Sequence, residues 1–161
     1  MDTETSGFDN YELIQIAVIL YKDGKAHENY KRLYMPVGKI TPGAKNVHGW
    51  TKKKLNEKGA KQFTKADSET LATFLMKYPN LPIVAHNVQH DLNEVLMPAF
   101  DNVNNLERLS EAKRWRCTLE MSRQVPFLKF HGLDDLLEHF GFERRSLEVK
   151  HDAHADCILT A

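Results

Sequence analysis

Residues 12–21 read Glu-Leu-Ile-Gln-Ile-Ala-Val-Ile-Leu-Tyr, and this run decides the fold class. Nearly all of its residues are apolar and several are β-branched, which is typical of a central strand with both faces covered. Asp23-Gly24 follows as a turn signal, and Tyr30 to Met35 are predicted to form a second strand that pairs antiparallel with the first. The sheet is therefore predicted to contain an early hairpin.

Apolar residues at helical spacing follow the hairpin. One helix is predicted after the capping residues 67–68, and another directly after a short buried strand at Leu81 to Ala85, so that Asp91 lies where a strand gives way to a helix. Residues 133–140 predict a third helix, and Asp152 begins a fourth. Strands followed by a mixture of helices and strands predict an α/β fold.

Residues 36–49 contain two prolines and three glycines and show little periodicity. This composition predicts a surface loop.

Length and composition limit the possible classes of protein. The 161 residues, 42% of them apolar and 27% charged, fit one ordinary domain. Only two cysteines occur, at unpaired spacing, which excludes a disulfide or zinc framework and favours a reducing cytoplasm. No run approaches the roughly 20 apolar residues that a membrane span needs, and Met1 leads into charged residues rather than a targeting segment. We expect a cytoplasmic domain without a membrane partner.

Lysine and arginine number 22 and so do the acidic residues, so the net charge of zero provides no global attraction for a polyanion. The cationic residues nevertheless cluster in three places: Lys52, Lys53, Lys54, Lys58 and Lys61; Lys113, Arg114 and Arg116; and Arg144 and Arg145. Such clusters are usually solvated faces, and they are also the pattern that meets phosphate. Both interpretations stay open at this stage.

Acidic residues at three distant places carry the candidate chemistry: the Asp2-Thr3-Glu4 tripeptide, Asp91 and Asp156. In a strand, Asp2 and Glu4 point to the same face, so both carboxylates can reach one metal ion. Taken singly, each has an ordinary explanation as a solvated turn, a helix cap or an exposed helix face. Together, converging carboxylates would repel one another unless divalent cations offset their charge.

Four segments in order resemble the motifs of the DEDDh exonucleases, the family that includes proofreading subunits of bacterial DNA polymerase, ribonuclease T and oligoribonuclease. The four segments are Asp2-Thr3-Glu4-Thr5-Ser6-Gly7, Val47-His48-Gly49-Trp50-Thr51, Val84-Ala85-His86-Asn87-Val88-Gln89-His90-Asp91 and His151-Asp152-Ala153-His154-Ala155-Asp156. The resemblance covers the whole chain, and it implies a ribonuclease H-like fold with a central mixed β-sheet flanked by helices.

The resemblance also implies the site. Asp2, Glu4, Asp91 and Asp156 would ligate two Mg²⁺ or Mn²⁺ ions, and His151 would be the general base. The expected activity is 3′-to-5′ hydrolysis of single-stranded nucleic acid, DNA in preference to RNA, with release of 5′-mononucleotides. The histidine subclass is preferred because Asp152 stands where a sister subclass carries tyrosine.

Further residues are assigned by position in the motifs. Thr5 and His48 are expected to line the pocket for the terminal nucleotide, with Asn87 contacting substrate or fixing the loop that presents Asp91. For His48 the alternative is an ordinary loop histidine. Trp50 could stack a base or simply pack, and both readings stay open.

His154 is the rival for the base, and it is disfavoured because it lies only two positions before Asp156 and would point to a different face of the helix.

Other functions also stay open. An RNA-trimming exoribonuclease would use the same ligands, and a non-catalytic nucleic-acid-binding domain could keep the fold. Zinc hydrolysis is disfavoured, since the eight histidines lack the pattern of a metalloprotease helix and their neighbours are oxygen ligands. A role in DNA replication and proofreading would add a polymerase partner. We expect 1–161 to be a single exonuclease domain whose first strand and last helix are incomplete, because only Met1 precedes the first motif.

Overall fold

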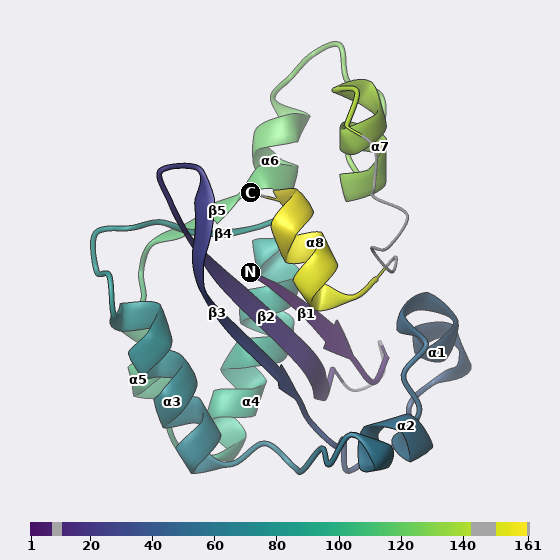
Figure 1. The fold of residues 1–161 in the computed structure, drawn as a ribbon, viewed down its shortest axis with the longest axis vertical. Coiled ribbons are helices and arrows are strands. Elements are labelled where there is room, and N and C mark those ends of the chain that lie inside the picture. The colour runs from purple at the N-terminus through teal and green to yellow at the C-terminus, as the bar shows by residue number, and fades with distance from the viewer. Residues whose placement is uncertain (8–10, 143–150, 161) are drawn as a thin grey trace.

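The computed structural model describes residues 1–7, 11–142 and 151–160, and it shows an α/β fold (Figure 1). The strands are β1 (Asp2–Thr5), β2 (Leu13–Lys22), β3 (Lys25–Leu33), β4 (Ile83–Ala85) and β5 (Trp115–Cys117). The helices are α1 (Pro42–His48), α2 (Lys52–Glu57), α3 (Lys65–Met76), the wide π-type helix η1 (Gln89–Leu96), α4 (Met97–Asn102), α5 (Leu106–Ser110), α6 (Thr118–Arg123), α7 (Leu133–His139) and α8 (Ala153–Thr160).

The predicted central strand is confirmed as β2, which pairs antiparallel with β1 on one side and β3 on the other. Its side chains alternate between two covered faces. Ile16 and Val18 pack with the core that α3, η1, α4 and α5 share, whereas Ala17 packs with Ala153 and Cys157 of α8. This alternation explains why the run reads as almost continuously apolar.

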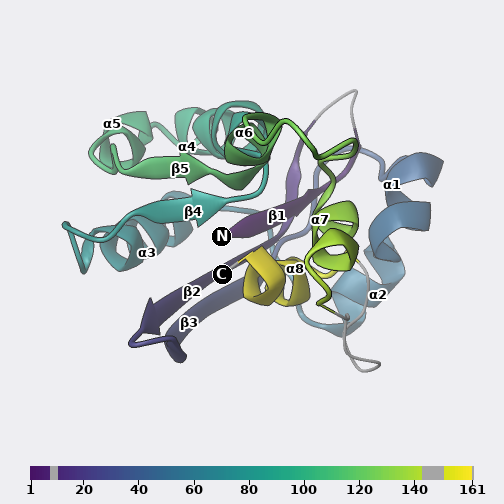
Figure 2. The same ribbon diagram turned by 90° about the horizontal axis from the view of Figure 1, so that it is seen from above.

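A second pair of strands, β4 and β5, is parallel. The amino group of Met1 donates a 2.7 Å hydrogen bond to the carbonyl of Val84, so the start of β1 lies against β4. In Figure 2, β1 lies between β2 and β4. The antiparallel strands β1 to β3 therefore lie beside the parallel pair β4 and β5, and helices cover both faces. The prediction that both end elements continue in a longer chain stays a prediction.

The hairpin is confirmed, but the predicted bounds of its second strand were wrong. β3 begins at Lys25 rather than Tyr30, because Asp23 and Gly24 form the turn with φ angles of 52° and 70°. The first five residues of β3 are polar or small and largely exposed, as on an edge strand, so they carry no apolar signal.

The predicted surface loop at 36–49 was also wrong, because it contains α1. Thr41 caps this helix by accepting from the N–H of Ala44, Pro42 occupies the first turn, and Gly49 ends it at φ 71°. With His48 as its only buried residue, α1 lacks the apolar periodicity on which helix prediction rests.

The other predicted elements are present with adjusted ends. The cap of α3 is Thr64, in a reciprocal capping box with Asp67, rather than the residues 67–68. Gly141, at φ 74°, follows closely after α7. Arg144 and Arg145 lie outside the described residues. Within the described ranges, every helix is too short or too polar to cross a lipid bilayer.

Candidate active site

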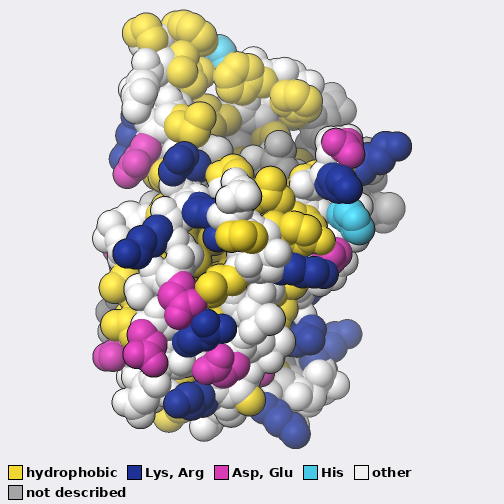
Figure 3. All heavy atoms as spheres, turned by 90° about the vertical axis from the view of Figure 1, so that its left-hand side faces the viewer, with side chains coloured by type: hydrophobic (Ala, Val, Ile, Leu, Met, Phe, Trp, Pro, Cys, Tyr) yellow, Lys and Arg dark blue, Asp and Glu magenta, His cyan; other side chains and the backbone are white. Residues whose placement is uncertain are grey.

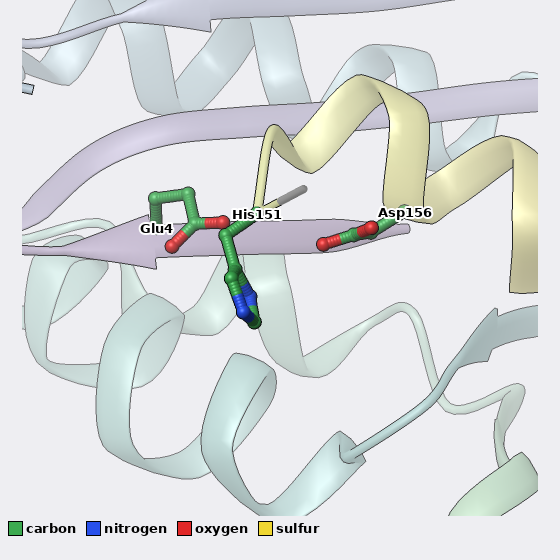
Figure 4. Close-up of side chains that lie close together, drawn as sticks. All are labelled: Glu4, His151 and Asp156. Atoms are coloured by element: carbon green, nitrogen blue, oxygen red, sulfur yellow. The ribbon is translucent and has the colours of Figure 1, made fainter. Parts of the chain in front are cut away.

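Three of the predicted site residues meet at one point of the sheet. One ligand atom from each of Glu4, His151 and Asp156 lies within 4.8 Å of the other two. Glu4 comes from β1, His151 from the residues just before α8, and Asp156 from α8 itself (Figure 4). The contact of α8 with β1 therefore joins the first and last motifs of the chain.

Asp2 and Asp91 belong to the same electrostatic cluster. Burial raises the pKa of Asp2 well above its ordinary value, and the negative charges of Asp91, Glu4 and Asp156 raise it further. Since such effects weaken with distance, Asp2 and Asp91 lie in the neighbourhood of the cluster formed by Glu4, His151 and Asp156.

Asp91 is held by a residue whose part the sequence did not indicate. The hydroxyl of Thr3, on the face of β1 opposite to Asp2 and Glu4, donates a 2.7 Å hydrogen bond to a carboxylate oxygen of Asp91. Asp91 lies in the first turn of η1 and is 2% exposed. Burial raises its pKa, and the bond from Thr3 opposes that rise. Thr3 thereby fixes the third motif to the first.

His151 has a φ of 57°, in the left-handed region that residues with a Cβ seldom occupy. His151 lies just before α8, and one nitrogen of its imidazole is within 4.8 Å of a carboxylate oxygen of Glu4 and of Asp156. Among the described residues the cluster includes His151 and not His154, which lies inside α8.

A buried polar network that sequence reasoning missed positions the start of α8. Gln15 is fully buried on β2, on the face that α8 covers. Its amide nitrogen donates to Asp152 at 2.9 Å, and its amide oxygen accepts from the backbone N–H of Ala153 at 3.3 Å and from the indole N–H of Trp50 at 3.2 Å. Asp152 in turn caps α8 by accepting from its first N–H groups. The one signal in the sequence is a glutamine inside an otherwise apolar strand.

The three predicted substrate-binding residues occupy different settings. Thr5 is buried at the end of β1, and Asn87 is exposed at the turn after β4. His48 is buried next to the site: its Nε2 donates to the carbonyl of Thr5 at 3.0 Å, and its Nδ1 accepts from the N–H of Trp50 at 2.9 Å. Burial lowers the pKa of His48, so its neutral form is favoured. With both nitrogens occupied, His48 organises the site's backbone.

His86 is likewise a structural residue of the third motif. Its Nε2 donates to the carbonyl of His131 at 2.9 Å, while its Nδ1 pairs with the hydroxyl of Thr118 at 3.0 Å. These bonds fix the loop that leads into η1. Trp50 packs with the small core around Ile14, which gives it a packing role alongside its bond to Gln15.

Neither of the two apolar cavities of about 270 and 420 Å³ contains the four carboxylates. The first opens beside Met1, between Val18–Tyr21 and Leu81–Val84, and the second lies among η1, α4 and α5. Cavity size would thus point away from the acidic cluster. The chemistry of the side chains identifies the site instead.

The oxygen-rich donor set fits a divalent metal. Carboxylates are the ligands that Mg²⁺ and Mn²⁺ prefer. Burial first, and then the charges of neighbouring carboxylates, raise the pKa of Asp2 and of Glu4, and cations would offset both effects. Asp2, Glu4, Asp91 and Asp156 would hold such ions, with His151 beside them.

A family model described as Exonuclease matches residues 1–161. The chain belongs to this exonuclease family. The resemblance to the DEDDh exonucleases predicted from the four motifs is thereby confirmed, and membership supports nuclease activity for the domain. A comparison with curated protein sequences finds no match.

Two solved structures resemble the exonuclease domain in fold. Exonuclease X, in complex with 5′ overhanging duplex DNA, has a TM-score of 0.70 and 21% identity, over 99% of this chain and 83% of that one. Cell-death related nuclease 4 has a TM-score of 0.65 and 20% identity, over 99% of this chain and 58% of that one. These likenesses confirm the predicted ribonuclease H-like fold.

Glu4 makes the stability of the metal-free exonuclease domain depend on pH. Burial, and then the charges of Asp156, Asp152 and Asp91, raise its pKa from 4.5 to about 8. The folded state therefore binds the proton of the Glu4 carboxyl more tightly than the unfolded state does. The stability that this proton contributes is complete below pH 4.5 and is lost as the pH rises towards 8. The total loss is about 5 kcal/mol at about 1.4 kcal/mol per pKa unit.

We therefore expect the free energy of unfolding, measured in chelator between pH 5 and 9, to fall less steeply in Glu4→Gln than in the unsubstituted protein. Glu57→Gln, which changes an exposed carboxylate on α2, is the matched control and should follow the unsubstituted curve. A Glu4→Gln curve parallel to that of the unsubstituted protein would refute the assignment.

Replacing Gln15 by leucine is expected to destabilise the fold by about 3 kcal/mol. The change leaves the N–H groups of Trp50 and Ala153 without their acceptor, and it removes one of the donors to Asp152. Gln62→Leu, an exposed position in a loop, should change the stability by less than about 0.5 kcal/mol. Denaturant unfolding of both variants measures the difference, and equal stabilities would show that the network contributes nothing.

Proposed function

We propose that the domain is a metal-dependent 3′-to-5′ exonuclease that hydrolyses the terminal phosphodiester of single-stranded nucleic acid and releases 5′-mononucleotides. The observation that carries the proposal is the convergence of Glu4, His151 and Asp156 within 4.8 Å, beside the coupled carboxylates of Asp2 and Asp91. Membership of the exonuclease family supports it.

In this proposal the four carboxylates ligate two Mg²⁺ or Mn²⁺ ions, and each other role belongs to a residue of the chain. When bound, such ions neutralise charge at the scissile phosphate and make water more acidic. His151 takes the proton of the attacking water. Its imidazole is half-buried just before α8 and lies close to the carboxylates of Glu4 and Asp156. Thr5 and Asn87 contact the terminal nucleotide, and His48 holds the carbonyl of Thr5.

DNA is the preferred substrate in this proposal. The solved structure of Exonuclease X is a complex with DNA, which supports the assignment. An exoribonuclease that trims RNA 3′ ends would use the same carboxylates, and its preference would lie in contacts to the 2′-OH. A part in DNA replication as a proofreading partner of a polymerase, in the cytoplasm, is the setting we propose for the DNA enzyme.

The test is release of label from single strands carrying it at the 3′ or the 5′ end, with DNA and RNA in parallel. In Mg²⁺ or Mn²⁺ we expect the 3′ label to leave first, as a mononucleotide, and chelator to stop the reaction. Loss of the 5′ label first, or internal cuts, would overturn the polarity. No cleavage by folded, metal-bound protein would favour a non-catalytic binding domain.

A further inference from the structure

The net charge of zero conceals a strongly uneven distribution. Residues 36–61, which we name the basic segment, include α1 and α2. They hold one acidic residue, Glu57, and seven lysines: Lys39, Lys45, Lys52, Lys53, Lys54, Lys58 and Lys61. The rest of the chain is left with fifteen cationic and twenty-one acidic residues. The basic segment therefore carries a charge of +6, and the remainder carries −6.

The positive charge of the basic segment is exposed and uncompensated. All seven lysines are exposed, and none of them forms a salt bridge with another described residue. Lys52 and Lys54 donate to backbone carbonyls, which leaves their charge in place. Glu12, an acidic side chain from outside the segment, accepts from the N–H groups of Val37 and Gly38.

Direct contacts connect the basic segment to the candidate active site. The ammonium of Lys54 donates to the carbonyl of Gly49 at 2.8 Å, directly after His48. His48 donates to the carbonyl of Thr5, the residue after Glu4. In Figure 1, α1 and α2 lie beside the end of β1.

The opposite side of the molecule has a different character. Figure 3 shows that face, where cationic and acidic side chains are interspersed over its lower half. Interspersed charges of opposite sign offset one another, so they give no directional field. The seven lysines of the basic segment lie instead on the elements that border the acidic cluster.

We propose that the basic segment binds the phosphate backbone of the strand whose 3′ end enters the active site. The proposal rests on the exonuclease function proposed above. Four carboxylates repel a polyanion, so a neighbouring field of +6 offsets this repulsion and steers the strand to the site. Lysines on flexible stems recognise phosphate without reading the bases, which suits an enzyme that removes any terminal nucleotide.

The test removes three lysines whose side chains make no hydrogen bond within the described structure: Lys53→Gln, Lys58→Gln and Lys61→Gln together. The control carries the same loss of charge elsewhere, by Lys22→Gln, Lys25→Gln and Lys129→Gln, all exposed and outside the segment. Each triple variant is compared with the unsubstituted protein by KM and kcat on a labelled strand of about 20 nucleotides and on a dinucleotide, over a range of salt concentrations.

For the basic-segment variant, KM on the long strand is expected to rise about tenfold to a hundredfold at about 0.1 M salt, with kcat unchanged. The slope of log KM against log salt should fall by about 2, since each single-strand phosphate contact contributes about 0.7. Kinetics on the dinucleotide, which is too short to reach the segment, should not change, and the control should match the unsubstituted protein throughout.

A binding measurement separates failure of this inference from failure of the proposed function. The affinity of an end-labelled strand is measured in an Asp156→Asn background, where no cleavage interferes. If the dependence of log affinity on log salt concentration has the same slope in both triple variants, the phosphate-binding role is overturned, even if the enzyme is active. A slope reduced only in the basic-segment variant would uphold it, even if the polarity of cleavage proved to be different.

Discussion

Replacing Asp156 by asparagine is expected to lower the rate of phosphodiester hydrolysis by about a thousandfold. Asp156 is 6% exposed and faces Glu4 and His151 across the site. The amide keeps the shape of the side chain but removes a negative charge from the metal site, and a loss of about 4 kcal/mol of transition-state stabilisation corresponds to this factor. Release of mononucleotides under single-turnover conditions measures the loss.

The matched control is Asp101→Asn, an exposed carboxylate on α4, which should keep full activity. In chelator the fold of Asp156→Asn should be at least as stable as that of the unsubstituted protein near neutral pH, because the charge of Asp156 raises the pKa of both Asp2 and Glu4. Activity within tenfold of the unsubstituted protein would exclude Asp156 from the metal site.

The second large effect is expected at His151. Asparagine is the suitable replacement, since it tolerates the left-handed backbone at φ 57° better than most residues and removes the imidazole. Loss of a general base lowers the rate by about a hundredfold to ten-thousandfold. The activity of His151→Asn, and its affinity for Mn²⁺, are the two quantities to measure.

The affinity for Mn²⁺ decides between two roles that the geometry of His151 permits. A general base leaves metal binding unchanged when it is removed, whereas a metal ligand weakens metal binding together with the rate. We expect kcat to fall with Mn²⁺ affinity retained. His154→Ala, in the first turn of α8, is the control and should lose less than about threefold in rate; a larger loss there than in His151→Asn would make His154 the base.

The elements that the sequence predicts well are those whose burial leaves a periodic apolar signal. The run at 12–21 became β2 because both its faces are covered. The helical spacing at 133–140 became α7, where Leu133, Leu136 and Leu137 are half-buried. The helix α1 was missed because one residue of its seven is buried, so its only signals were the cap at Thr41 and the glycine at its end. Local capping chemistry is the clue that such short helices offer.

The candidate site likewise contains residues that the sequence indicates and residues that only the structure reveals. Motif order indicated the four carboxylates and His151, since each motif is local in sequence. The bond from Thr3 to Asp91 spans 88 positions, and that from Gln15 to Asp152 spans 137. Contacts of this kind depend on how β1, β2, η1 and α8 pack together, which one sequence does not disclose. The roles of Thr3 and Gln15 therefore emerge only from the structure.

The most direct test of the account is a crystal structure of the protein with Mn²⁺ and a 5′-mononucleotide, in which anomalous scattering locates the ions. The account predicts two ions about 4 Å apart, within bonding distance of carboxylates among Asp2, Glu4, Asp91 and Asp156, with the phosphate of the nucleotide against them and His151 nearby. Mn²⁺ bound away from these carboxylates, in protein that is active under the same conditions, would contradict it.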